Sequence, residues 1–100
     1  MRTPEDVVAY GDEVAAVLGE LLGDGLEGVY FVGSVALGGY VPGQSDIDIV
    51  AVSIGALGHA AKPLVAEVVF ETTTRCPARG LEFTLYRREV TASSPLGADF

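Results

Sequence analysis

Two aspartates interrupt an apolar, β-branched run in the middle of this chain, and their spacing limits what the run can form. Residues 46–53 read Asp-Ile-Asp-Ile-Val-Ala-Val-Ser. β-branched residues favour a strand, in which residues i and i+2 point to the same face. Asp46 and Asp48 therefore project together, about 6.6 Å apart along the strand, while Ile47 and Ile49 point towards the core. Two carboxylates placed in this way repel each other unless a cation such as Mg²⁺ lies between them.

Helical and strand patterns alternate along the rest of the chain. Thr3 as N-cap, Pro4 at the first helical position and the acidic residues behind them predict an amphipathic helix over 4–22, which the Gly-Asp-Gly at 23–25 ends. The resulting order is α-β-α-β-α-β, with strands too short for a standard doubly wound sheet. The other predicted elements are a strand over 28–32, a short helix over 35–40, a turn at 42–43, a strand over 46–53, a helix that begins near Lys62 with Pro63 in its first turn, and a strand over 81–87.

The composition is that of one small globular domain. The chain has 100 residues, and fourteen acidic against six basic residues give a net charge of −8. That acidity argues against nucleic acid as a partner and suits a cationic small molecule or a metal–nucleotide complex. The arginines at 75, 79, 87 and 88 are interpreted as solvated charges of loops and strand ends. The sequence holds no apolar run long enough for a membrane span, and the lone Cys76 indicates a reducing cytoplasm.

The strand predicted over 81–87 offers a third carboxylate. Leu81, Phe83 and Leu85 share one face of it, so Glu82 lies on the other face. If this strand pairs with the strand over 46–53, Glu82 completes a three-carboxylate cluster. Such a cluster suits two metal ions that bridge substrate oxygens in an in-line displacement at phosphorus. Each part alone has a plainer interpretation, since the aspartates would suit the solvated face of an edge strand and Glu82 a solvated strand position.

A Gly-Ser pair precedes the aspartates by about a dozen residues. Gly33 permits close backbone approach, the Ser34 hydroxyl donates a hydrogen bond, and a helix that follows presents free N–H groups to a phosphate. Most Gly-Ser pairs are simple turns. The pair becomes informative here because it lies between two apolar strands and ahead of the Ser-Asp-x-Asp segment.

Together these residues resemble the signature of the DNA polymerase β-like nucleotidyltransferase superfamily. Residues 32–50 read Val-Gly-Ser-Val-Ala-Leu-Gly-Gly-Tyr-Val-Pro-Gly-Gln-Ser-Asp-Ile-Asp-Ile-Val, most similar to aminoglycoside adenylyltransferases of the streptomycin/spectinomycin type. Residues 76–83, Cys-Pro-Ala-Arg-Gly-Leu-Glu-Phe, resemble the third-carboxylate segment of that branch. The resemblance spans roughly residues 28–86. It implies an α+β fold, a small mixed and twisted sheet with helices packed on one face.

The resemblance also implies a reaction and residue roles. The reaction would move a nucleoside monophosphate, AMP from ATP, to a hydroxyl of a cationic small molecule, an aminoglycoside, with release of pyrophosphate; the enzyme would confer antibiotic resistance. Mg²⁺ would be required, with two ions expected. By the resemblance, Gly33, Ser34 and Ser45 would bind the triphosphate, Asp46 and Asp48 would bind metal, and Glu82 would be the catalytic base or third metal carboxylate.

Enzymes of this branch carry a helical C-terminal domain that provides much of the acceptor site, whereas residues 91–100 of this sequence show no clear element. We therefore expect residues 1–100 to be a nucleotidyltransferase domain from a longer enzyme, and leave its activity alone and its oligomeric state open. A second interpretation is a minimal nucleotidyltransferase that acts as an antitoxin or interaction module; against it, Val-Ala-Leu at 35–37 replaces the usual Arg or Thr. An aspartyl phosphatase is excluded because Val50 occupies the required Thr position, and the three carboxylates disfavour a catalytically dead domain.

Overall fold

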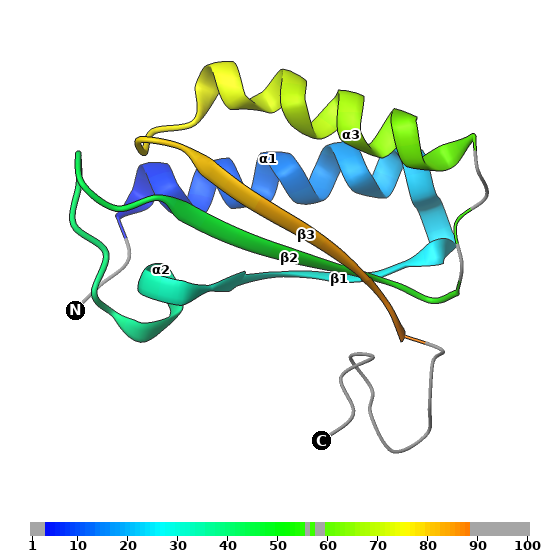
Figure 1. The fold of residues 1–100 in the computed structure, drawn as a ribbon, viewed down its shortest axis with the longest axis horizontal. Coiled ribbons are helices and arrows are strands. Elements are labelled where there is room, and N and C mark those ends of the chain that lie inside the picture. Colours follow the sequence, from blue (N-terminus) through cyan, green and yellow to red (C-terminus); the bar gives the residue numbers. More distant parts are fainter. Residues whose placement is uncertain (1–3, 56, 58–59, 89–100) are drawn as a thin grey trace.

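The computed structural model of the chain describes residues 4–55, 57 and 60–88, so the predicted cap at Thr3 and the tail over 91–100 lie outside the described residues. The order of elements is α-β-α-β-α-β, as predicted, with two short 3₁₀ turns added (Figure 1). The elements are α1 (Glu5–Leu22), a 3₁₀ turn (Gly23–Gly25), β1 (Leu26–Val32), α2 (Gly33–Leu37), β2 (Ile47–Ser53), α3 (Ala61–Thr72), a second 3₁₀ turn (Thr73–Arg75) and β3 (Leu81–Arg87).

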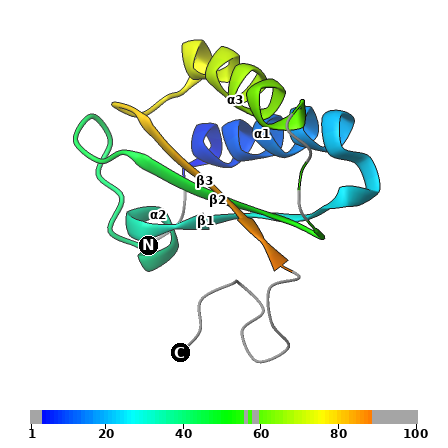
Figure 2. The ribbon, with the colours of Figure 1, turned by 45° about the vertical axis from the view of Figure 1, so that its right-hand side comes forward.

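The three strands form one mixed sheet in the order β1-β2-β3. β1 is antiparallel to β2, and β2 is parallel to β3, with α3 in the connection between them. Both long helices, α1 and α3, lie side by side on the same face of this sheet, as the two views agree (Figures 1 and 2). The fold is therefore the α+β arrangement predicted, with helices packed on one face of a small mixed sheet.

The core lies between this helix layer and the sheet. Ile47, Ile49 and Ala51 of β2 are at most 1% exposed, because the central strand has neighbours on both sides and helices above it. The apolar stripe of α1 meets them, and α3 adds two valines to the same cluster. Because residues alternate along a strand, burial of these three residues turns Asp48 to the opposite face of the sheet. The helical members of the core are Val7, Tyr10, Val14, Leu18, Val65 and Val69.

Local backbone conformation explains where the observed elements differ from the predicted ones. Pro4 is extended, at φ −58° and ψ 147°, and is the N-cap of α1, whereas the prediction placed it at the first helical position. The short helix was predicted over 35–40 but begins directly at Gly33 and ends at Leu37, because Gly38 adopts a left-handed conformation with φ 81°. Pro63 lies in the first turn of α3, as predicted.

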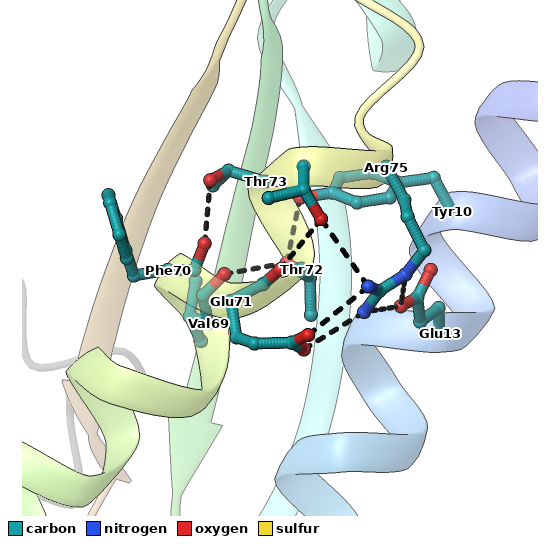
Figure 3. Close-up of polar contacts among 9 residues, drawn as sticks. Tyr10, Glu13, Val69, Phe70, Glu71, Thr72, Thr73 and Arg75 are labelled. Atoms are coloured by element: carbon teal, nitrogen blue, oxygen red, sulfur yellow. Dashed lines mark hydrogen bonds and ion pairs between the residues drawn. The ribbon is translucent and has the colours of Figure 1, made fainter.

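Polar contacts join α1 to the end of α3 (Figure 3). The Tyr10 hydroxyl and Thr72 Oγ1 share a buried hydrogen bond of 2.9 Å, and burial raises the pKa of the Tyr10 phenol. On the surface, the Arg75 guanidinium contacts the carboxylates of Glu13 and Glu71. These contacts fix the end of the helix layer from which the chain runs back to β3, and β3 carries Glu82.

Candidate active site

The sheet register brings the predicted carboxylates to one face. Asp48 pairs with Glu82 across the parallel β2–β3 ladder and with Val32 across the antiparallel β1–β2 ladder. Asp46 directly precedes β2, where the Ile47 N–H donates to the Gly80 carbonyl oxygen at 2.9 Å. Asp48 and Glu82 therefore lie on the face opposite α1 and α3, which we call the open face, near the first residues of β2 and β3, and Asp46 lies just before this edge. Adjacent strands are separated by only about 4.8 Å.

Gly33 is required by the position of the Asp48 carboxylate. Gly33 has φ +66°, a left-handed conformation that residues with a Cβ rarely adopt. A Cβ at this position would also lie 2.1 Å from Asp48 Oδ2. The Asp48 side chain therefore occupies the space that the glycine leaves free, beside the first turn of α2. This close approach joins the Gly-Ser turn and the Asp-x-Asp strand into one site.

Asp46 turns towards the connection before β3. Its Oδ1 lies 3.8 Å from Arg79 Nε, and the same oxygen is 3.5 Å from the place a Cβ on Gly80 would take. Asp46 and Asp48 thus have different neighbours. Within the described ranges, no group of three His, Cys, Asp or Glu side chains is drawn together as a metal-binding set. The register aligns Asp48 with Glu82, and Asp46 lies two residues before Asp48, but their oxygens do not converge on one point.

The donor set nevertheless suits Mg²⁺ in its chemistry. Magnesium prefers hard oxygen ligands and commonly uses one or two carboxylates together with substrate phosphates. Asp46 and Asp48 supply such oxygens from one strand edge, and Glu82 supplies a third from the paired position. The space that Gly33 leaves lets Asp48 lie against the backbone at the start of α2.

The two serines differ in what they do in this structure. Ser34 lies in the first turn of α2, and its hydroxyl makes no hydrogen bond with the residues that the structure describes. Ser45 instead closes the loop before β2: its Oγ accepts from the Val41 N–H at 2.9 Å, and its own N–H donates to the Val41 carbonyl at 2.9 Å. Ser34 is therefore available to a ligand, and the Ser45 hydroxyl oxygen helps to fix the loop that delivers Asp46.

Arg79 is the neighbour of the site that sequence reasoning missed. The arginines late in the chain were interpreted as solvated charges, which ignores that Arg79 lies three residues before Glu82. The return of the chain to β2 at Gly80 places Arg79 beside Asp46. A basic residue just before the strand that carries the third carboxylate is the sequence signal that indicates it.

Two cavities lie elsewhere. One, of about 200 Å³, lies at the far end of β2 and β3, and one of about 100 Å³ lies between α1 and β1; neither is lined by a predicted site residue. Of the three carboxylates, Glu82 is exposed, and Asp46 and Asp48 are half-buried. None of the helices in the described part of the chain combines the length and apolar character needed to cross a bilayer. The larger cavity is lined by Ser53, Leu57, Lys62, Leu85, Tyr86 and Arg87.

Comparison with known families agrees with this geometry. The fold and site define an α+β domain with carboxylates and a Gly-Ser turn at one end of its sheet. Residues 12–74 match the family model described as a nucleotidyltransferase domain, and the match includes Gly33, Ser34, Asp46 and Asp48. This chain belongs to that family, which confirms the resemblance to polymerase β-like nucleotidyltransferases. No curated protein and no solved structure gave a match. Since the family match ends at residue 74, the case for Glu82 rests on the register.

Proposed function

We propose that this domain transfers AMP from ATP to a hydroxyl of a cationic small molecule, an aminoglycoside in the first instance, and releases pyrophosphate. The observation that carries the proposal is the register that pairs Asp48 with Glu82, beside the Gly33–Ser34 turn. Membership of the nucleotidyltransferase family supports the transfer of a nucleotide. Cys76 is a free thiol, and we propose the cytoplasm as the compartment.

Each residue of the site has a role that its position supports. Gly33 and Ser34 would hold the triphosphate through backbone N–H groups and the free hydroxyl, and Ser45 would assist from the preceding loop. Asp46, Asp48 and Glu82 would hold Mg²⁺, with two ions expected, and bound Mg²⁺ would neutralise charge on the phosphates. Glu82 is exposed on the open face; as the alternative to binding a metal ion, it would act as the base that accepts the proton of the acceptor hydroxyl. The hydroxyl oxygen bonds to the α-phosphorus as the bond to the β-phosphate oxygen breaks, and pyrophosphate leaves.

The charge of the chain supports the proposed acceptor class. A net charge of −8 attracts polycations and repels nucleic-acid backbones. Aminoglycosides carry several ammonium groups together with hydroxyls. The family branch that the sequence resembles places most acceptor contacts on a helical C-terminal domain. We propose that this nucleotidyltransferase domain works together with such a domain.

One observation favours the second candidate, an interaction module of the antitoxin type. Three apolar or aromatic residues of the open face are substantially exposed: Tyr30 at 49%, Val32 at 37% and Tyr86 at 42%. Exposed apolar surface of this kind suits a protein partner as well as a nucleotide base. Nucleotide binding distinguishes the two candidates, because a module needs no Mg²⁺-dependent ATP site.

Isothermal titration with ATP in Mg²⁺ buffer tests the site. The double variant Asp46→Asn with Asp48→Asn should abolish Mg²⁺-dependent ATP binding. The matched control is Asp12→Asn with Asp24→Asn, which removes two exposed carboxylates outside the site and should bind as wild type does. Unchanged binding in the site variant would refute the assignment. Pyrophosphate release with ATP and a panel of aminoglycosides then tests the acceptor, and release with none of them argues against that class.

A further inference from the structure

Arg79 is held next to the carboxylates by its backbone and not by its side chain. The Gly80 carbonyl, one residue further on, accepts the Ile47 N–H at 2.9 Å, which fixes this segment beside Asp46. The Arg79 side chain itself is 67% exposed, against 35% for Asp46. A long, solvated side chain on an anchored backbone can therefore change partners without disturbing the sheet.

The contact between Arg79 and Asp46 is an ion pair without a hydrogen bond. Their closest atoms, Nε and Oδ1, are 3.8 Å apart, beyond the range of about 2.7–3.2 Å for an N–H···O bond. Two other arginines are bound more closely to their partners: Arg75 bridges Glu13 and Glu71, and Arg88 Nε lies 3.1 Å from Glu27 Oε1. Arg79 differs from them because its guanidinium is close to its partner but leaves its N–H groups unused in that contact.

The surroundings show what those N–H groups suit. Arg79 lies beside Asp46, a carboxylate suited to a divalent cation. Two residues further along the chain, Asp48 lies against the turn at Gly33. A guanidinium binds phosphate oxygens through paired N–H···O bonds and does so better than it binds one distant carboxylate oxygen. A cation that binds Asp46 would compete with Arg79 for that carboxylate and leave the guanidinium to turn elsewhere.

We propose that Arg79 is a phosphate-contacting residue of this site that exchanges partners on ligand binding. Without ligand, its guanidinium partly neutralises Asp46. When a cation and a nucleoside triphosphate bind, the cation takes the Asp46 carboxylate and the guanidinium turns to the triphosphate oxygens. This inference rests on the proposed nucleotide site and adds to it a cationic group from within this domain.

The exchange predicts two effects of opposite sign when Arg79 is removed. Binding of the divalent cation alone should become tighter, because its competitor for Asp46 is gone. Binding of the triphosphate should become weaker, because a charge-assisted contact is lost. A residue that only supported the local fold would weaken both. The opposite signs therefore separate a direct role from a structural one.

The experiment uses Arg79→Gln, Arg79→Lys and the control Arg88→Gln, which removes an exposed, ion-paired arginine away from the site. Titrations are made with Mn²⁺ alone and with ATP in the presence of Mg²⁺, and circular dichroism checks the fold of each variant. Arg79→Gln should bind Mn²⁺ about two- to fivefold more tightly and ATP about tenfold or more weakly. Arg79→Lys should recover part of the ATP affinity, because it keeps the charge but not the paired geometry.

The outcomes are distinguishable. If wild type binds ATP and Arg79→Gln binds it equally well, or loses Mn²⁺ and ATP binding together, the partner exchange is wrong and the nucleotide site stands. If Arg88→Gln changes both affinities as Arg79→Gln does, the effect is one of net charge and the proposal is also wrong. If wild type binds no ATP, the proposed function fails, and this inference with it.

Discussion

The two faces of the sheet show how a strand can serve the fold and the site at the same time. On the helix-covered face, Ile47, Ile49 and Ala51 are buried against α1 and α3. On the open face, the intervening positions begin with Asp48, which pairs with Glu82 and lies against Gly33. Neighbouring residues of one strand thus serve different purposes: one set packs the core, and the other set forms the candidate site. A substitution on the covered face should therefore mainly change stability, and one on the open face should mainly change the site.

Removal of the predicted base should give the largest effect on the open face. Glu82→Gln keeps the size of the side chain but cannot accept the hydroxyl proton, so pyrophosphate release in the presence of an acceptor should fall by about 10²- to 10⁴-fold. The melting temperature should stay close to that of wild type. Glu67→Gln, an exposed carboxylate on α3, is the matched control. Equal rates in the two variants would remove Glu82 from the catalytic role.

On the covered face, the large effect should be on stability. Ile49→Ala leaves a cavity beneath the helices and should lower the free energy of unfolding by about 2–5 kcal/mol. Val50→Ala, one residue further on and facing the open side, should cost less than half as much, because Val50 is only partly buried. Urea denaturation of both variants measures the difference. Equal losses would show that the two faces are equally packed.

Gly33 matters both for the backbone conformation and for the candidate site, so its substitution should lower both stability and ATP affinity. Gly33→Ala forces a left-handed conformation on a residue with a Cβ, at about 1–2 kcal/mol, and displaces the Asp48 carboxylate. ATP affinity should fall together with stability. Gly23→Ala is the control, because Gly23 also has positive φ but no atom within 4 Å of its would-be Cβ. The Gly23→Ala variant should lose stability and keep ATP binding. If both glycine variants lost ATP binding, the loss could not be attributed to displacement of Asp48.

The smallest effect should come from the surface contacts of the helix layer. Hydrogen bonding to Arg75 lowers the pKa of the Glu71 carboxyl. A lowered pKa stabilises the folded state above the unfolded pKa of about 4.3, and this stabilisation is lost as pH falls through the folded pKa. Arg75→Gln should therefore melt slightly below wild type at pH 7, and the gap should close in acid. High salt should also reduce this difference in melting temperature. A difference that changed with neither pH nor salt would show that it is not electrostatic.

Much of the fold could be predicted because the alternation of apolar residues in strands and their helical spacing can be recognised within short stretches of sequence. β3 begins and ends where predicted, and Pro63 lies in the first turn of α3. The start of α2 was placed two residues late, because a glycine after a strand was interpreted as a break, whereas Gly33 begins the helix with positive φ.

The pairing of the candidate site residues could be predicted from the sequence, but their side-chain contacts could not. Strand alternation and one assumption about pairing predict that Asp48 and Glu82 lie side by side, and the register confirms that pairing, whereas Asp46 precedes the strand. In the structure, Asp48 turns to Gly33 and Asp46 turns to Arg79. These directions depend on side-chain rotamers that are set only when the chain is packed. The Ser45 hydroxyl was predicted to bind nucleotide, and its contact with Val41 shows a loop-closing contact that no spacing rule indicates. Its nucleotide role stays a prediction.

The parallel pairing of β2 with β3 has a consequence for the order of assembly. β1 and β2 are close in sequence, whereas β3 joins only after α3 has crossed the sheet. Long-range parallel pairing is slow compared with local antiparallel pairing. Gly33, Ser34 and the two aspartates can therefore come together early in folding, while Glu82 arrives with the last strand. A partly folded chain would therefore bring the Gly-Ser turn and the two aspartates together before Glu82 joins them, and the proposed site would be complete only when β3 docks.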